Sequence, residues 1–154
     1  MKRAVLLLCL PLTASGAQIE FTRTQLCERA HSIVVGEVTD IETRPSADGS
    51  LERWVHLTVS ETLKGAAISD VTVTAPGGTL NGMSVWVEHS PVFSTEAKYL
   101  LFLEAPDTSA SADSAPTYTV VADEQGTVRL TPEGALVGET LESAMLSIEA
   151  CRAK

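Results

Sequence analysis

The sequence is poor in basic residues: 11 lysines and arginines stand against 20 acidic residues, and the formal net charge is −9. Nucleic-acid binding depends on basic side chains that neutralise phosphates, so this deficit argues against it. The same deficit argues against adhesion to anionic lipid. After the N-terminal segment there is also no long apolar run, whereas a membrane-spanning helix needs about 20 apolar residues. We therefore expect no nucleic-acid partner, and no membrane span once an N-terminal leader is removed.

Recognisable catalytic motifs are lacking as well. The sequence has no G-x-S-x-G turn, and its three histidines show no metal-ligand spacing such as HExxH. The glycine-rich segment 76–82 lacks the lysine-hydroxyl pair of a phosphate-binding loop. The alternate-residue pattern of a calcium loop is missing too. We expect a protein that is not an enzyme and that carries no cofactor and no metal.

The N-terminal residues have the order of a secretory signal peptide. Lys2 and Arg3 precede an apolar run over residues 4–12, and small residues fill positions 13–17. The apolar run is too short to cross a bilayer. The pattern predicts a signal peptide over residues 1–17, and hence a secreted or periplasmic protein.

Two alternatives to a cleaved leader stay open, an N-terminal core element and a lipoprotein leader acylated at Cys9. Cleavage after Ala17 would leave one domain, residues 18–154, which is long enough for a real core. The leader would remove two basic residues and no acidic one, so the mature formal charge would be −11.

Cysteine is scarce, with three residues in the whole chain. Cys9 would leave with the leader, and Cys27 and Cys151 would remain near the two ends. In an oxidising compartment such a pair predicts a single disulfide, with two free thiols as the alternative. In the chain-entropy model a loop of that size restricts the unfolded state by ~4 to 5 kcal/mol.

Most of the chain has the periodicity of β-strands. Over residues 51–63 apolar and polar side chains alternate, as in a strand with one face in the core. Residues 99–103 are apolar on both faces and should form the most buried strand. Gly36 interrupts a β-branched run and predicts a bulge or bend. Further strands are expected over residues 33–41, 71–75 and 85–87, with a hairpin of 118–122 and 127–130.

Helical periodicity is confined to the two ends. Thr22 and Gln25 have capping-box spacing and predict one or two turns of helix over residues 22–31. Residues 139–151 place their apolar side chains on one face, as in an amphipathic helix that packs on the sheet. Five or six antiparallel strands with a bent first strand and these helices favour a mostly β fold: a small closed barrel of OB type.

Four stretches, taken in order, also resemble a known family. They are LCERAHSIVVGEVTDIE, VHLTVSETLKG, VTVTAPGG and KYLLFLE. Over residues 24–151 they look similar to the netrin-like OB domain of tissue inhibitors of metalloproteinases and related secreted modules, including uncharacterised exported bacterial proteins. In that family a cysteine before the first strand is tied to a helix after the barrel, and Cys27 and Cys151 occupy those places. The resemblance implies an OB fold and a binding role.

The mechanism of the inhibitors does not carry over with the resemblance. They chelate the protease zinc through a mature N-terminal cysteine in a Cys-x-Cys start. Cleavage after Ala17 would make Gln18 the first residue here, and no cysteine follows until Cys27. What carries over is the fold and the general role of a secreted binding module.

The residues we nominate for a contact surface are Trp54, Trp86, Gly77 and Gly78. Both tryptophans fall on the outward register of their strands, where a large ring is costly unless it is covered. Either they pack beneath the 105–117 loop or the terminal helix, or they form an exposed aromatic patch. The glycines fit a wide turn between strands, or a loop that lets another backbone approach closely.

Ordinary solvent exposure is the expectation for the remaining polar groups that could do chemistry. His56 falls on the polar face of its strand. Glu37, Asp40 and Glu42 line the first strand, and carboxylates at such spacing on an acidic protein usually face solvent.

Three functional hypotheses follow from these features, in decreasing order of support. The first is a secreted, non-enzymatic binding module whose partner is another protein, with an exported protease as one candidate. The second is a cell-envelope or glycan-binding structural module that uses the Trp54 and Trp86 face. A hydrolase is third. An exposed planar pair of tryptophan rings would favour the second hypothesis, and buried rings would weaken it.

Overall fold

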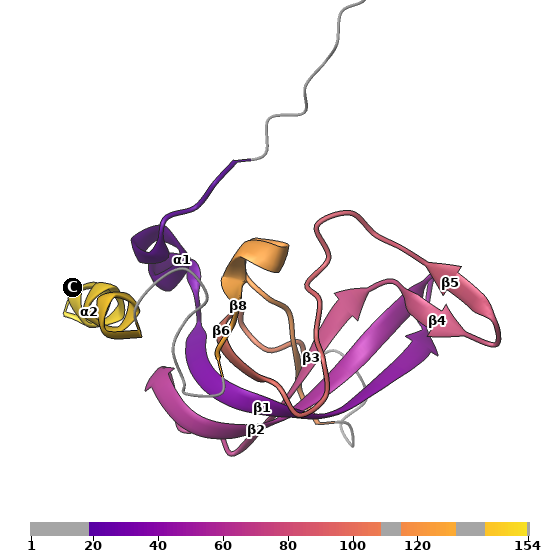
Figure 1. Ribbon diagram of the computed structural model, residues 1–154, viewed down its shortest axis with the longest axis horizontal. Coiled ribbons are helices and arrows are strands. Elements are labelled where there is room, and N and C mark those ends of the chain that lie inside the picture. The colour runs from indigo at the N-terminus through magenta and orange to yellow at the C-terminus, as the bar shows by residue number, and fades with distance from the viewer. Residues whose placement is uncertain (1–18, 109–114, 132–140, 154) are drawn as a thin grey trace, which may run out of the picture.

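The protein is mostly β, as expected. The computed structural model describes residues 19–108, 115–131 and 141–153. Short helices lie near both ends of this part of the chain, and strands fill most of what lies between them (Figure 1). In chain order the elements are α1 (Arg23–Arg29), β1 (Ser32–Pro45), β2 (Leu51–Lys64), β3 (Asp70–Pro76), β4 (Gly78–Leu80), β5 (Met83–Val85), β6 (Lys98–Leu103), β7 (Thr117–Tyr118), the 3-10 helix η1 (Asp123–Gly126), β8 (Thr127–Arg129) and α2 (Leu141–Arg152).

A six-stranded sheet with the order β7-β3-β2-β1-β6-β8 forms the body of the protein. The long strands β1 and β2 pair antiparallel along nearly their whole lengths, and β6 pairs with the first half of β1. The register between β1 and β2 shifts at Gly36, as the sequence predicts, and again between Val38 and Asp40. These irregularities bend the two strands around the core.

The closed barrel expected from the sequence is not formed. Within the described residues, β7 and β8 are the two opposite edges of the sheet, and no ladder joins them. The chain beyond β7 meets the end of β6 through a single bridge, Val120 with Leu103. Ala122 and Asp123 then adopt left-handed backbone angles and enter η1, which ends the extended run. A two-residue β7 and this turn leave too little extended chain for a closing ladder.

The predicted hairpin of 118–122 and 127–130 is also wrong, because the turn at Ala122 and Asp123 interrupts the extended chain. Its two halves separate: β7 pairs parallel with β3, and β8 pairs antiparallel with β6. The 3-10 helix η1 lies between the two halves and directs the second one to the far edge of the sheet. The short strand expected over 85–87 is also displaced, because β5 ends at Val85 and Trp86 lies beyond it.

The strand β6 separates two apolar clusters. Its residues 99–103 are all buried, as predicted for the most buried strand. Tyr99, Leu101 and Leu103 face a cluster formed by the main strands, while Leu100 and Phe102 face a second cluster that contains α1 and α2. Because successive side chains of β6 point to opposite faces, this one strand contributes to both apolar clusters.

The helix α1 begins with the capping box that the sequence predicts. The Thr22 hydroxyl accepts from the Gln25 backbone N–H, and the Gln25 side chain accepts from the Thr22 backbone N–H. At its other end the Lys64 ammonium donates to the carbonyls of Cys27 and Ala30 at 2.6 and 2.7 Å. Both ends of this short helix thus have partners for backbone groups that the helix itself leaves unpaired.

Cys27 on α1 and Cys151 on α2 are brought together at disulfide distance, with their Cα atoms 6.3 Å apart. The first side chain is fully buried and the second nearly so. This is the pairing expected from the sequence. It fastens the two helices to each other on one side of the sheet.

Some expectations fall on residues outside the described part of the chain. These are the leader over 1–17, its cleavage after Ala17, and the middle of the 105–117 loop. No helix of the described residues is both long enough and apolar enough to cross a membrane.

Candidate functional site

The glycine-rich segment forms a small hairpin that projects from the main sheet. Strands β4 and β5 pair through Leu80 and Met83, and the two residues between them, Asn81 and Gly82, have φ angles of 50° and 79°. Positive φ at both central positions is the requirement of a type I′ turn, which Asn-Gly satisfies best. The hairpin lies at the end of the protein opposite the two helices (Figure 1).

Gly77 and Gly78 connect β3 to this hairpin by a close approach of backbones. Both have positive φ, 88° and 131°. A Cβ on Gly77 would lie 2.8 Å from the Val85 carbonyl oxygen, and one on Gly78 would lie 2.7 Å from the Thr43 hydroxyl oxygen. The absence of a side chain therefore lets Gly77 pack closely against β5, and Gly78 against β1.

A concentration of exposed apolar side chains marks this end of the protein. Of seven large apolar side chains exposed among the described residues, five lie within residues 83–92. Trp86 is 81% exposed and Val92 is 72% exposed. Together with Val85 and Val87 they line a groove of about 350 Å³, which we call the hairpin groove. A monomeric protein seldom leaves so many large apolar groups in one short segment without a use for them.

The hairpin groove also contains a cationic group, Arg53. Its Nη2 donates to the Ser90 hydroxyl at 2.7 Å, and to the carbonyls of Pro91 and Pro76 at 2.9 and 3.2 Å. Its Nε is buried and makes no hydrogen bond, and burial lowers the pKa of the guanidinium below its usual range. Within the described residues no carboxylate neutralises this charge. The groove is therefore apolar along its sides and positive at one point.

Trp54 does not join this surface. Neighbouring residues of a strand face opposite sides of the sheet, so Trp54 points away from the groove that Arg53 lines. Its indole N–H donates to Glu52 at 2.9 Å, and the Arg44 guanidinium lies 4.4 Å from the ring centroid. The structure thus brings Gly78 and Trp86 together at the groove, with Gly77 beside them, and leaves Trp54 half-buried on the outer face.

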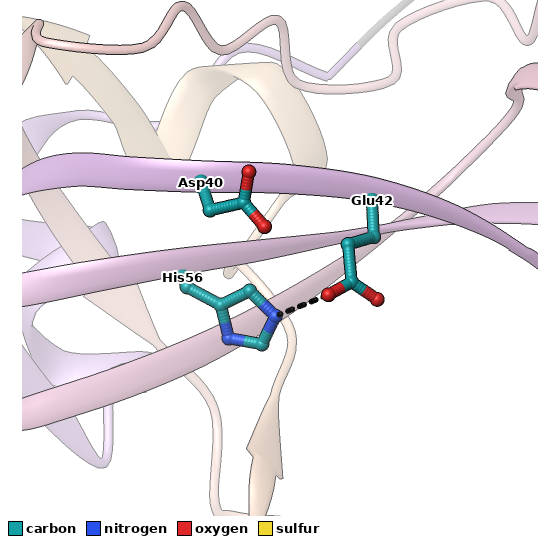
Figure 2. A group of neighbouring side chains, drawn as sticks. All are labelled: Asp40, Glu42 and His56. Atoms are coloured by element: carbon teal, nitrogen blue, oxygen red, sulfur yellow. Dashed lines mark ion pairs between the residues drawn. The ribbon is translucent and has the colours of Figure 1, made fainter.

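A second group of side chains gathers on that outer face: Asp40 and Glu42 of β1, and His56 of β2 (Figure 2). One ligand atom from each lies within 4.8 Å of the others. The His56 Nε2 is 4.0 Å from a Glu42 carboxylate oxygen, and its Nδ1 lies 3.0 Å from the Thr72 hydroxyl. The His56 and Glu42 side chains are 33% and 43% exposed, so the group is open to solvent.

Sequence reasoning missed this group because a bulge creates it. Val38 pairs with Leu57 and Asp40 with His56, which leaves Thr39 as the extra residue. Strict alternation from buried Val38 would turn Asp40 inward; the inserted residue reverses the faces and turns Asp40 and Glu42 outward. No local signal in the sequence shows where such an insertion falls.

A third contact ties the loop after Trp86 to η1. The His89 Nδ1 lies 2.9 Å from a Glu124 carboxylate oxygen, and the Glu124 backbone N–H donates to the His89 carbonyl at 3.1 Å. Hydrogen bonding to Glu124, supported by the nearby charges of Glu88 and Asp123, raises the pKa of His89 above its usual value. This ion pair fixes the far end of the loop that carries the groove.

Comparison of the chain with models of known protein families and with curated proteins finds no match.

Proposed function

We propose that this protein is an exported, non-enzymatic binding module whose partner is another protein, docked on the hairpin groove. The observation that supports this proposal is the gathering of Val85, Trp86, Val87 and Val92 along one groove, with Trp86 almost fully exposed. Large aromatic side chains are enriched among the residues that contribute most of the binding free energy at protein interfaces, because one ring removes much apolar area from water at a small entropic cost.

The charge of the groove favours a partner segment that carries a carboxylate beside its apolar side chains. Arg53 is cationic, half-buried and unpaired with any carboxylate of the described residues. A carboxylate from a partner would neutralise the positive charge of Arg53. Charge pairs of this kind set specificity and register at interfaces. An exported protease is the partner class that the resemblance to netrin-like inhibitors implies.

A glycan or cell-envelope ligand is the second candidate, and one observation favours it: the exposed ring of Trp86. A flat pair of exposed rings would have made this the first candidate. Trp54 does not supply the second ring, because Arg44 covers it and it points to the other face of the sheet.

The test starts with capture from the culture supernatant of the native host, with the purified protein as bait. The captured protein is then purified and its Kd for the bait is measured. Truncation of a central interface tryptophan costs about 2 kcal/mol or more, so Trp86→Ala should weaken binding by at least about 30-fold. Leu146→Ala is the matched control, because Leu146 is 60% exposed on α2, at the other end of the protein.

Equal binding by the parent and by Trp86→Ala would refute docking on the hairpin groove. Binding of oligosaccharides that depends on Trp86, with no protein captured, would support the glycan candidate instead. Cleavage of ester, peptide or glycoside substrates at enzyme-like rates would overturn both.

A further inference from the structure

We propose that Asp40, Glu42 and His56 bind a divalent transition-metal cation, with zinc as the representative ion, on the outer face of the sheet. The site would be separate from the hairpin groove, because Trp54, which neighbours it on β2, points away from that groove.

The chemistry of the three side chains selects the class of cation. An imidazole nitrogen with two carboxylates suits zinc and its neighbours in the first transition series, and sites of three protein ligands leave a fourth position for water. Calcium and magnesium prefer oxygen ligands alone, and calcium takes six to eight of them. His56 therefore favours a transition metal over the alkaline-earth ions.

The spacing of the ligand atoms is close to what a metal requires. Bonds of about 2.0–2.1 Å at tetrahedral angles place neighbouring ligand atoms about 3.3 Å apart. The His56 Nε2 and the Glu42 oxygen are 4.0 Å apart, and all three ligand atoms lie within 4.8 Å. Exposed side chains can close the remaining gap by small rotations, while the paired strands hold their Cα atoms in place.

A residue outside the group orients the imidazole. The Thr72 hydroxyl on β3 lies 3.0 Å from the His56 Nδ1, which leaves Nε2 directed toward Glu42. Histidines that ligate metals almost always use their second ring nitrogen in this way, and the partner fixes both the tautomer and the ring direction. Thr72 is therefore a positioning residue for the site.

Glu42 is oriented in the same manner. The Arg44 Nε donates to one of its carboxylate oxygens at 2.8 Å, and the other oxygen faces His56. The second carboxylate, Asp40, lies two residues along β1 on the same face and brings like charge close to Glu42. A bound dication would offset this repulsion, since opposite charge at short range favours ionised carboxylates.

The test is titration of the purified, disulfide-bonded protein with zinc chloride by calorimetry in a buffer that does not chelate metals. We expect one equivalent to bind. His56→Gln, Asp40→Asn and Glu42→Gln should each lower the affinity by about ten-fold or more, and Thr72→Val by about ten-fold. His31→Gln and Asp70→Asn are the controls, since both residues are exposed and lie outside the group, and they should leave the affinity unchanged.

NMR spectra of the unmodified protein provide a second test that does not depend on whether a variant folds. The NMR signals of the His56 ring should shift on zinc addition, before those of His31 and His89. The proposal is overturned if no binding is seen at millimolar zinc, if His56→Gln binds as tightly as the parent, or if calcium displaces zinc.

Discussion

Removing the cross-link between Cys27 and Cys151 should destabilise the protein severely. The two cysteines are 124 residues apart in sequence. In the chain-entropy model, closing a loop of that length lowers the entropy of the unfolded chain enough to stabilise the fold by about 5 kcal/mol at 25 °C. Domains of this size have total stabilities of about 5–15 kcal/mol. The double variant Cys27→Ala/Cys151→Ala should therefore be marginally folded or unfolded.

The assay is guanidinium denaturation followed by tryptophan fluorescence, for the parent, the double variant and the reduced parent. The reduced parent is the matched control, because it loses the bond and keeps both sulfur atoms. Both altered forms should lose similar free energies of unfolding if the cross-link itself is responsible. A loss of less than about 1 kcal/mol in the reduced parent would refute the reasoning. So would an intact mass for the untreated protein that corresponds to two free thiols.

Two further predictions concern the segments around the hairpin groove. Gly78→Ala should destabilise the protein by more than about 1 kcal/mol, because φ is 131° and a Cβ would lie 2.7 Å from the Thr43 hydroxyl oxygen; denaturant midpoints measure this, and an unchanged midpoint would contradict it. Glu124→Gln should lower the pKa of His89 in an NMR titration, because the carboxylate hydrogen bond raises it. Since the folded-state pKa is raised, the contact stabilises the fold at low pH and that contribution is lost as pH rises through the raised pKa; an unchanged His89 titration would contradict the assignment.

Local patterns in the sequence predicted individual elements well. The alternation over residues 51–63 corresponds to β2, and the doubly apolar run over 99–103 corresponds to β6. Thr22 and Gln25 form the predicted capping box of α1. Each of these signals acts within a few residues, so the physical cause is contained in the stretch that shows it.

Pairing between distant segments was predicted less well. Periodicity identifies a strand but does not identify the strand it pairs with. The sequence predicts a hairpin of 118–122 with 127–130, whereas β7 pairs with β3 and β8 pairs with β6. The prediction of a closed barrel is wrong for a related reason: nothing in the sequence around Ala122 indicates the left-handed turn that ends the extended chain there.

The candidate sites divide along the same line. Local sequence predicts Trp86, Gly77 and Gly78 as contact residues, and the structure places Trp86 and Gly78 at one groove, with Gly77 beside it. The sequence predicts Asp40, Glu42 and His56 to be ordinary exposed side chains. It does not predict that they lie close together, because their proximity depends on a bulge at Thr39 and on the pairing of two strands. Whether Trp54 would join Trp86 also depended on which face of β2 meets the hairpin.

The hairpin β4–β5 stands at one extremity of the protein and the cross-linked helices at the other. Residues 79–85 at its tip contribute nothing to either buried cluster. Changes in the tip, in evolution or in the laboratory, should therefore leave the framework intact and alter only the hairpin groove, which Val85 helps to line.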